Sequence, residues 1–153
     1  MTTSITLTTR LISGNLFAYW SEQGPEGLQT EFPGTVLVTD DLEEWAEIQV
    51  TAWQAKRQRV NSRGALQVRV LVHVFVRQGT NEGRLQEVAE LVRGALENRL
   101  IALREGDEEN DEVQGYLRLR EGEIRDLSPR EREADGSGLR HAVVLFSGRA
   151  ESA

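Results

Sequence analysis

The chain has 153 residues, a length that suits one domain, and a net charge of -7. This acidic balance argues against a protein that lives on phosphate backbones, because such proteins concentrate Lys and Arg to displace counterions. Cysteine is absent, which excludes disulfides, thiolate metal sites and cysteine nucleophiles together. Because the chain has neither an apolar run of about 18 residues nor a basic-then-apolar N-terminus, we expect a soluble intracellular protein.

The first part of the chain predicts one helix and then a loop. Residues Thr2 to Trp20 place apolar side chains near helical spacing, although the four threonines among them weaken helices through their β-branched side chains. Ser21 to Gly34 is rich in Gly and Pro, so we expect a surface loop there, with Phe32 as its single large apolar anchor.

The next part of the chain predicts two strands separated by an acidic turn, and a basic connection follows the second strand. A short β-branched run, Thr35 to Val38, predicts a first, short strand and leads into an acidic turn. An extended, mostly uncharged series from Trp45 to Trp53 predicts a second strand. A polar connection ending at Gly64 then joins this strand to the next, so the two strands should form an antiparallel pair. The acidic turn contains Asp40, Asp41, Glu43 and Glu44, and the connection contains Lys56, Arg57, Arg59 and Arg63. The basic connection suits a hydrated hairpin tip, with a specific anion site as the alternative.

The stretch from Gly64 to Leu103 supplies most of the expected core. Side chains alternate across a strand, so one face of this strand is apolar and the other begins polar and becomes partly apolar. The apolar face consists of Leu66, Val68, Val70, Val72, Val74 and Val76, and the other face of Gln67, Arg69, Leu71, His73, Phe75 and Arg77. From Leu85 the apolar spacing changes to three and four residues, which predicts a helix from about Glu82 to Leu103, roughly 33 Å long and capped by Thr80 or Asn81.

The last third of the chain predicts two more strands between charged loops. Arg104 to Glu112 is strongly acidic and must face solvent or a cavity. Val113 to Arg120 alternates as a strand that can continue toward Leu127, and 128–138 predicts a long loop. Leu139 to Gly148 is apolar on both faces, so we expect a strand internal to the sheet. The pattern as a whole predicts a single α+β domain over residues 1–153, with a mainly antiparallel or mixed β-sheet packed by a long central helix and an N-terminal helix.

Residues for catalysis or cofactor binding are not evident in the sequence. His73 and His141 lie inside predicted strands without a Ser, Asp or Glu at a catalytic spacing, so we interpret both as sheet-surface residues. Gly79 to Gly83 lacks the phosphate-binding patterns and is interpreted as a turn and helix cap. Asp107, Glu109 and Asp111 alternate like a calcium loop, but Glu112 replaces the required glycine. We therefore predict no catalytic residue, no cofactor and no metal site. Core packing is the expectation for Trp20, Trp45 and Trp53, and any exposed one would suit an interface.

The order of these elements resembles the tail terminator family of tailed bacteriophages. The resemblance rests on the N-terminal helix, the Phe32-Pro33 loop and the strand beginning at Trp45. It also rests on the Val-x-Val-Phe-Val pattern of 72–76, the Leu-x-Glu-Val-Ala-Glu-Leu-Val helix from Leu85 and the final Val-Val-x-Phe strand of 143–146. It covers roughly residues 1–148, and the segments 105–112 and 128–138 have no counterpart in it. These are patterns of fold and not catalytic signatures.

The resemblance implies a structural virion protein without enzymatic activity. Such a protein would assemble in the host cytoplasm into a homohexameric ring at the head-proximal end of the tail tube, in the virion neck. It would end tube polymerisation there and join the tail to the head. Its implied partners are further copies of itself, the tail tube protein, a head-tail connector protein and genomic DNA that passes without specific binding, with no membrane involved.

A ring needs two different complementary faces on each subunit. The basic connection from Lys56 to Arg63 and the acidic segments at 40–44 or 107–112 are candidates, together with Leu71 and Phe75 on the partly apolar strand face. An acidic wall would let DNA slide by repulsion, and the candidates for the channel or its rim are Glu108, Glu109, Asp111 and Glu112. The alternatives are a head-tail joining or tail tube protein of similar fold, or a small cytosolic α+β protein that binds a ligand or acts as an enzyme.

Overall fold

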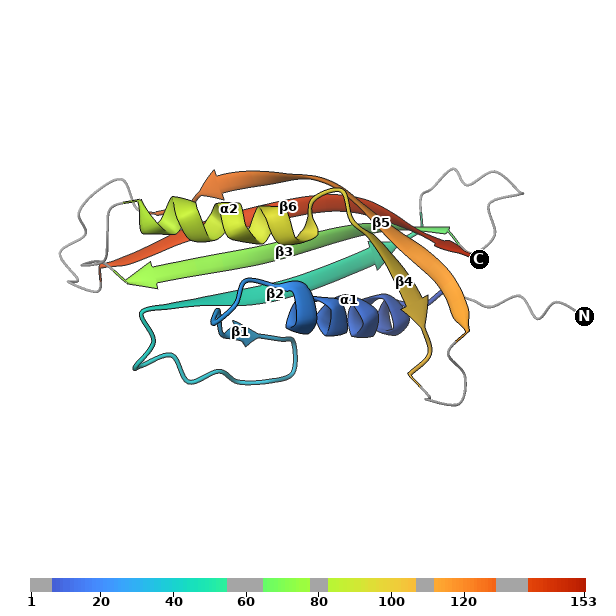
Figure 1. Ribbon diagram of the computed structural model, residues 1–153, viewed down its shortest axis with the longest axis horizontal. Helices are drawn as coiled ribbons and strands as arrows, with labels where there is room; N and C mark the ends of the chain where they lie inside the picture. Colours follow the sequence, from blue (N-terminus) through green and yellow to red (C-terminus); the bar gives the residue numbers. More distant parts are fainter. Residues whose placement is uncertain (1–6, 55–64, 78–82, 107–111, 129–137) are drawn as a thin grey trace, which may run out of the picture.

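Six strands and two helices form two layers, with both helices on the same face of one sheet (Figure 1). The structure, a computed structural model, describes residues 7–54, 65–77, 83–106, 112–128 and 138–153. The elements in chain order are α1 (Thr9–Gln23), β1 (Thr30–Glu31), β2 (Glu44–Trp53), β3 (Ala65–Arg77), α2 (Arg84–Leu96), β4 (Leu100–Arg104), β5 (Val113–Asp126) and β6 (Leu139–Ser152).

The sheet is mixed and curled, with the strand order β1-β2-β3-β6-β5-β4. β1 pairs with β2 in parallel, and every other neighbouring pair is antiparallel. One row across the middle of the sheet aligns Ile48, Val72, Val144 and Ile124. These observations confirm the predicted α+β class, the single domain and the antiparallel pairing of β2 with β3. β6 lies between β3 and β5, as its two apolar faces predicted.

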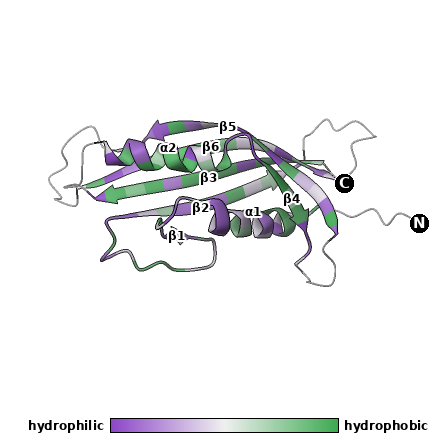
Figure 2. Cartoon of the chain, in the orientation of Figure 1, coloured by the Kyte–Doolittle hydropathy of each residue, from purple (hydrophilic) through white to green (hydrophobic). Residues whose placement is uncertain are grey.

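The core lies between the helices and the face of the sheet that they cover. Val68, Val70, Val72, Val74 and Val76 are all buried, as the alternation in this strand predicted, and Leu66 is partly buried against them. α2 covers this face with a buried stripe that consists of Leu85, Val88, Ala89, Val92 and Leu96. Figure 2 shows hydrophobic residues concentrated along β3 and recurring along α2.

The predicted length of the central helix is wrong. α2 has 13 residues and ends at Leu96, which makes it roughly 20 Å long. Asn98 has a φ of 55°, a left-handed conformation that ends a right-handed helix. Leu100 and Leu103 therefore belong to β4, which pairs with β5, and only Leu103 of the two is buried. The predicted caps Thr80 and Asn81 lie outside the described residues, and Gly83 at the helix start makes no side-chain cap bond.

The N-terminal helix is confirmed, although it begins at Thr9 and not near Thr2. Thr8 caps it by accepting a hydrogen bond on Oγ1 from the backbone N–H of Leu11 at 3.1 Å. Its buried residues Ile12, Leu16 and Trp20 recur every four positions, which places them on one stripe. Asn15 links the helix to β4, because its side chain donates to the Arg104 carbonyl and accepts from the Arg104 N–H, each at 3.0 Å.

The loops differ from the predictions in two places. Thr30–Glu31 forms the short strand β1 inside the segment predicted to be a loop. Thr35 to Val38 is not a strand, and Val36 and Val38 are exposed. β5 extends the predicted strand from Val113 to Asp126 through an irregularity between Leu119 and Gly122.

None of the helices in the described part of the chain has the length and apolar character needed to cross a membrane.

Candidate functional site

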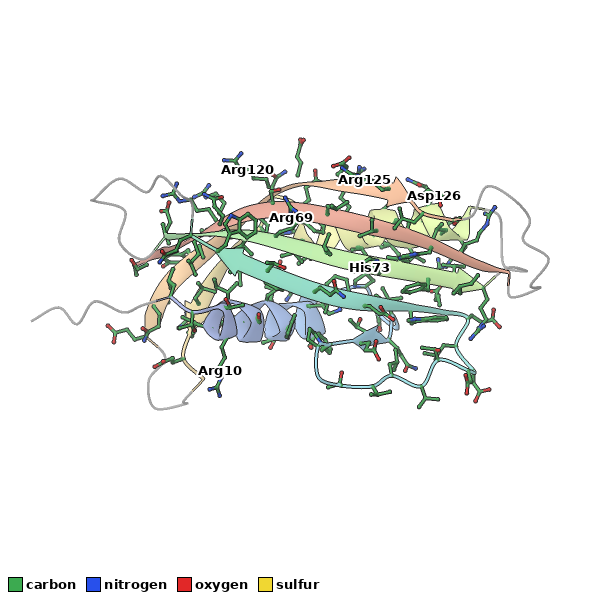
Figure 3. All side chains as sticks on the ribbon, turned by 180° about the vertical axis from the view of Figure 1, so that it is seen from behind. Arg10, Arg69, His73, Arg120, Arg125 and Asp126 are labelled. Carbon is green, nitrogen blue, oxygen red and sulfur yellow. The ribbon has the colours of Figure 1, made fainter. Side chains whose placement is uncertain are left out.

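The face of the sheet opposite the helices carries an apolar and aromatic cluster. Strand alternation and the pairing register place residues from β2, β3 and β6 on this face. We call them the outer-face cluster, which consists of Trp45, Leu71, His73, Phe75, His141, Val143 and Leu145. Figure 3 views the molecule from behind, with His73 and Arg69 on this side of the sheet. A sheet with one face packed by helices normally turns a polar face to water, so an apolar cluster here marks a surface that can be covered by a partner.

Stacked rings form the centre of the cluster. The rings of Trp45 and Phe75 stack with centroids 5.3 Å apart, and Phe75 stacks on His141 at 4.3 Å. The guanidinium of Arg77 lies 5.2 Å from the centroid of Trp45, within the range of a cation–π contact. Trp45 is only 6% exposed, so the sequence-based expectation of a packed tryptophan holds, but it packs on the outer face.

Arg77 also fixes the loop that leads into β2. Its Nε donates to the Leu42 carbonyl at 2.7 Å, and its Nη2 donates to the Thr39 carbonyl at 2.8 Å. Its backbone N–H donates to the carbonyl of Glu43 at 2.9 Å. The acidic turn is therefore held against one end of the outer-face cluster.

The two histidines of the chain contact each other. Nδ1 of His73 lies 2.8 Å from Nε2 of His141, so one ring donates an N–H and the other accepts it. Burial, followed by the charge of His73, lowers the pKa of the His141 imidazole below its ordinary value of 6.5. Both histidines lie on the sheet surface, as predicted.

The described residues around the histidine pair do not form a catalytic triad. Ser128 Oγ accepts from the backbone N–H of His141 at 3.1 Å, a contact with the main chain and not with the ring. Glu47 stands opposite His73 in the ladder, and burial followed by the charge of Glu31 raises the pKa of its carboxyl. Among the described residues, His, Asp and Glu side chains nowhere gather in a group of three or more that could hold a metal ion.

The acidic interface candidates lie beside the outer-face cluster but are not equivalent. Asp40, Asp41 and Glu43 are exposed. Glu44 instead accepts two hydrogen bonds from Arg84, at 2.7 Å from Nε and 2.6 Å from Nη2. The bond from Arg84 is the chief reason that the pKa of Glu44 is lowered. Glu44 is therefore paired within its own chain, and the other three carboxylates are exposed to solvent.

The remaining candidates divide between described and undescribed parts of the chain. Leu71 and Phe75 are half-buried members of the outer-face cluster. Glu112 is exposed just before β5. The candidates that lie outside the described residues are Lys56, Arg57, Arg59, Arg63, Glu108, Glu109 and Asp111.

Sequence reasoning missed several members of the cluster. Val143 and Leu145 were assigned only to a strand apolar on both faces, and Trp45 was assigned to core packing. The signal that would have found them is the alternation of 139–148, whose odd positions share a face with Phe75 once the two strands are paired. Trp53 is 41% exposed, and the guanidinium of Arg69 lies 5.7 Å from its ring centroid. Of the three tryptophans, Trp53 is therefore the one that a partner could contact.

Comparisons with known proteins bear on the fold alone. No protein-family model matches the chain, and no curated protein matches it. A solved structure whose name states no function is similar over 96% of this chain and 96% of its own, with a TM-score of 0.58 and 11% sequence identity. At this identity the likeness shows a shared chain topology and carries no statement about activity.

Proposed function

We propose that this chain is a non-enzymatic structural subunit of a phage tail, of the tail terminator type. It forms a homohexameric ring at the head-proximal end of the tail tube, ends tube polymerisation and joins the tail to the head. The observation that carries the proposal is the outer-face cluster, an apolar and aromatic surface that the two helices leave uncovered. The element order and its resemblance to tail terminators supply the particular assembly.

A ring contact needs a second surface that complements the first. Val36 is 90% exposed and Val38 is 73% exposed, so the segment 36–38, which we call the valine loop, presents apolar side chains to solvent. The valine loop follows β1 at one edge of the sheet, and the outer-face cluster lies on the sheet itself. Seating the valine loop of one subunit on the outer-face cluster of the next makes a head-to-tail contact, the kind of contact that generates rings.

The acidic balance of the chain suits the passage of DNA. With a net charge of -7 the subunit repels phosphate backbones, and Glu112 is exposed in the acidic segment proposed for the channel or its rim. In this role the ring needs no cofactor, and its partners are the tail tube protein and a head-tail connector.

Native mass spectrometry and electron microscopy of the purified chain test the assembly. We expect hexameric rings, and we expect the Val36→Ser/Val38→Ser variant to remain folded by circular dichroism but to lose them. The matched control is Leu91→Ser, which changes another exposed apolar residue, on α2 and outside both proposed surfaces. Rings retained by the valine-loop variant, or lost equally in the control, would contradict the proposed contact.

A comparison of phage particles assembled with and without the chain tests where in the tail the chain acts. Tails of uncontrolled length in its absence support a terminator. Normal tails that cannot attach to heads identify a joining protein of similar fold instead. A chain that stays monomeric even with tail tubes present and that binds a small molecule in a defined site would overturn the virion role.

A further inference from the structure

One side of β2 has no neighbouring strand along most of its length in the described part of the chain. β1 pairs only with Ala46 and Glu47. Because the N–H of Arg77 donates to the carbonyl of Glu43, the odd-numbered residues of β2 bond to β3. The N–H of Ala46 points the other way and donates to Gln29 at 2.9 Å, so the backbone groups of Val50 and Ala52 also point toward the open edge.

The residues along this edge are suited to pairing with another strand. Ile48–Trp53 reads Ile-Gln-Val-Thr-Ala-Trp, with no charge, no Gly and no Pro. Natural edge strands are usually protected from pairing by charges, by Pro or by bulges. The part of β5 that β4 leaves uncovered has such protection, because it carries Glu123, Arg125 and Asp126 after an irregularity in the ladder. The segment Ile48–Trp53 of β2 has no charged residue, no Pro and no bulge.

The charges at the two ends of this edge are opposite. At its N-terminal end Glu47 and Glu31 lie together, and Glu47 forms no ion pair with any described residue. Burial, followed by the charge of Glu31, raises the pKa of the Glu47 carboxyl. At its C-terminal end Arg69 stacks on Trp53. An antiparallel copy of the same strand therefore brings the end that carries Glu47 next to the end that carries Trp53 and Arg69.

We propose that β2 pairs antiparallel with β2 of a second copy of this chain, about a two-fold axis near Thr51. β1 occupies the edge as far as Glu47, so the free edge extends over residues 48–54, and a pair over this range is centred on Thr51. Side chains keep their faces in this pairing, because a two-fold axis perpendicular to the sheet leaves the helix-covered faces on the same side. The pairing does not depend on the ring proposed above. If the chain forms rings, the pairing would join a subunit of one ring to a subunit of another.

The Thr51→Cys variant tests the axis, since the chain has no other cysteine. In the new ladder Thr51 and its copy face each other as a pair without hydrogen bonds, with Cα atoms about 4.5 Å apart, a distance that a disulfide spans. We expect nearly complete disulfide-linked dimer under mild oxidation at low protein concentration. The control is Ser147→Cys, an exposed residue on the same face but inside the sheet, where only the background of random collision is expected. Crosslinking of Thr51→Cys no greater than in the control overturns the proposal.

Two further variants test the backbone pairing. Val50→Pro removes an N–H that points to the open edge and leaves the bonds to β3 in place, and Thr51→Lys places two like charges on the axis. We expect at least a tenfold rise in the dimer dissociation constant for each, measured by sedimentation, with unchanged circular dichroism for Thr51→Lys. Ser147→Lys, the matched control, should leave dimerisation unchanged. Dimers that persist in Thr51→Lys refute the pairing. Intact Thr51→Cys crosslinking in a chain that forms no rings would refute only the ring.

Discussion

His73 and His141 share one proton between ring nitrogens 2.8 Å apart, which makes this contact sensitive to pH. Protonating both rings would bring two N–H groups and two positive charges together on the outer face. Burial of His141 opposes its charging further, and only Asp126 acts in the opposite direction. The pair is therefore compatible with a neutral sheet surface and weakens when that surface is acidified.

Acidification through the ordinary histidine range should destabilise the fold. The pKa of His141 in the folded chain lies below its ordinary value of 6.5, so the unfolded chain binds the proton first as pH falls. The stabilising contribution is complete above pH 6.5 and is lost between 6.5 and the lower folded pKa. Urea unfolding at a series of pH values from about 7.5 to 5.5 measures this slope.

The His141→Gln variant should have a smaller pH dependence of its unfolding free energy over that range. Glu47 has a raised pKa and acts with the opposite sign, since its contribution is lost as pH rises above its ordinary 4.5. Because Glu47 is present in both proteins, the difference between them isolates His141. Equal slopes in the two proteins would show that the histidine does not titrate differently on folding.

An ion pair with two hydrogen bonds joins Arg84, the first residue of α2, to Glu44, the first residue of β2. Arg84 Nε and Nη2 bind the two carboxylate oxygens of Glu44 at 2.7 and 2.6 Å. The side chains are 35% and 25% exposed, so solvent screens the pair in part. We expect Arg84→Ala to lower the free energy of unfolding by about 1 kcal/mol. A double-mutant cycle with Glu44→Ala measures the coupling, and additive losses would show that the pair contributes nothing beyond its separate residues.

Two glycines should respond in opposite directions to the same substitution. A methyl group on Gly94 in α2 would have no atom within 4 Å, so Gly94→Ala should stabilise the helix by about 0.5–1 kcal/mol. A methyl group on Gly148 in β6 would lie 2.6 Å from the carbonyl oxygen of Arg118, a backbone atom of the neighbouring strand. Gly148→Ala should therefore destabilise the sheet by about 1–3 kcal/mol. Chemical denaturation of both variants checks the signs, and a shared sign would contradict the close approach of β5 and β6.

The elements that could be predicted from sequence are those with a long, uninterrupted period. The alternation of β3 extends over 13 residues and identified both of its faces, including Leu71 and Phe75. The end of α2 could not be predicted in this way, because Leu100 and Leu103 continue the helical spacing from Leu96. The break at Asn98 depends on the pairing of β4 with β5, which begins only at Val113. Likewise, the contact of His73 with His141 joins residues 68 positions apart, and only the register of β3 with β6 brings them together.

At the scale of the whole molecule, the two faces of the sheet differ, because the helices cover one face and the other is the one proposed to bind a second subunit. α1 and α2 cover one face of the sheet, and Val72 is completely buried on that face. The opposite face carries the outer-face cluster, and Leu71, the residue before Val72 in the same strand, is half-buried there. Under the proposed function, adjacent positions of β3 would separate folding from assembly, since successive side chains of a strand point to opposite faces.

Substitutions at these two positions should divide the two tasks. Val72→Asp buries a carboxylate in the core and should cost roughly 4 kcal/mol or more, a large share of the about 5–15 kcal/mol typical of a domain, so folding and assembly should be lost together. Leu71→Glu places its charge on the outer face, costs about 1 kcal/mol and should leave a folded monomer. Circular dichroism reports the fold, and native mass spectrometry reports the assembly. A folded, ring-competent Val72→Asp chain would show that the core face is assigned wrongly. A ring-competent Leu71→Glu chain would remove the outer-face cluster from the subunit contact and place that contact on the edges of the sheet.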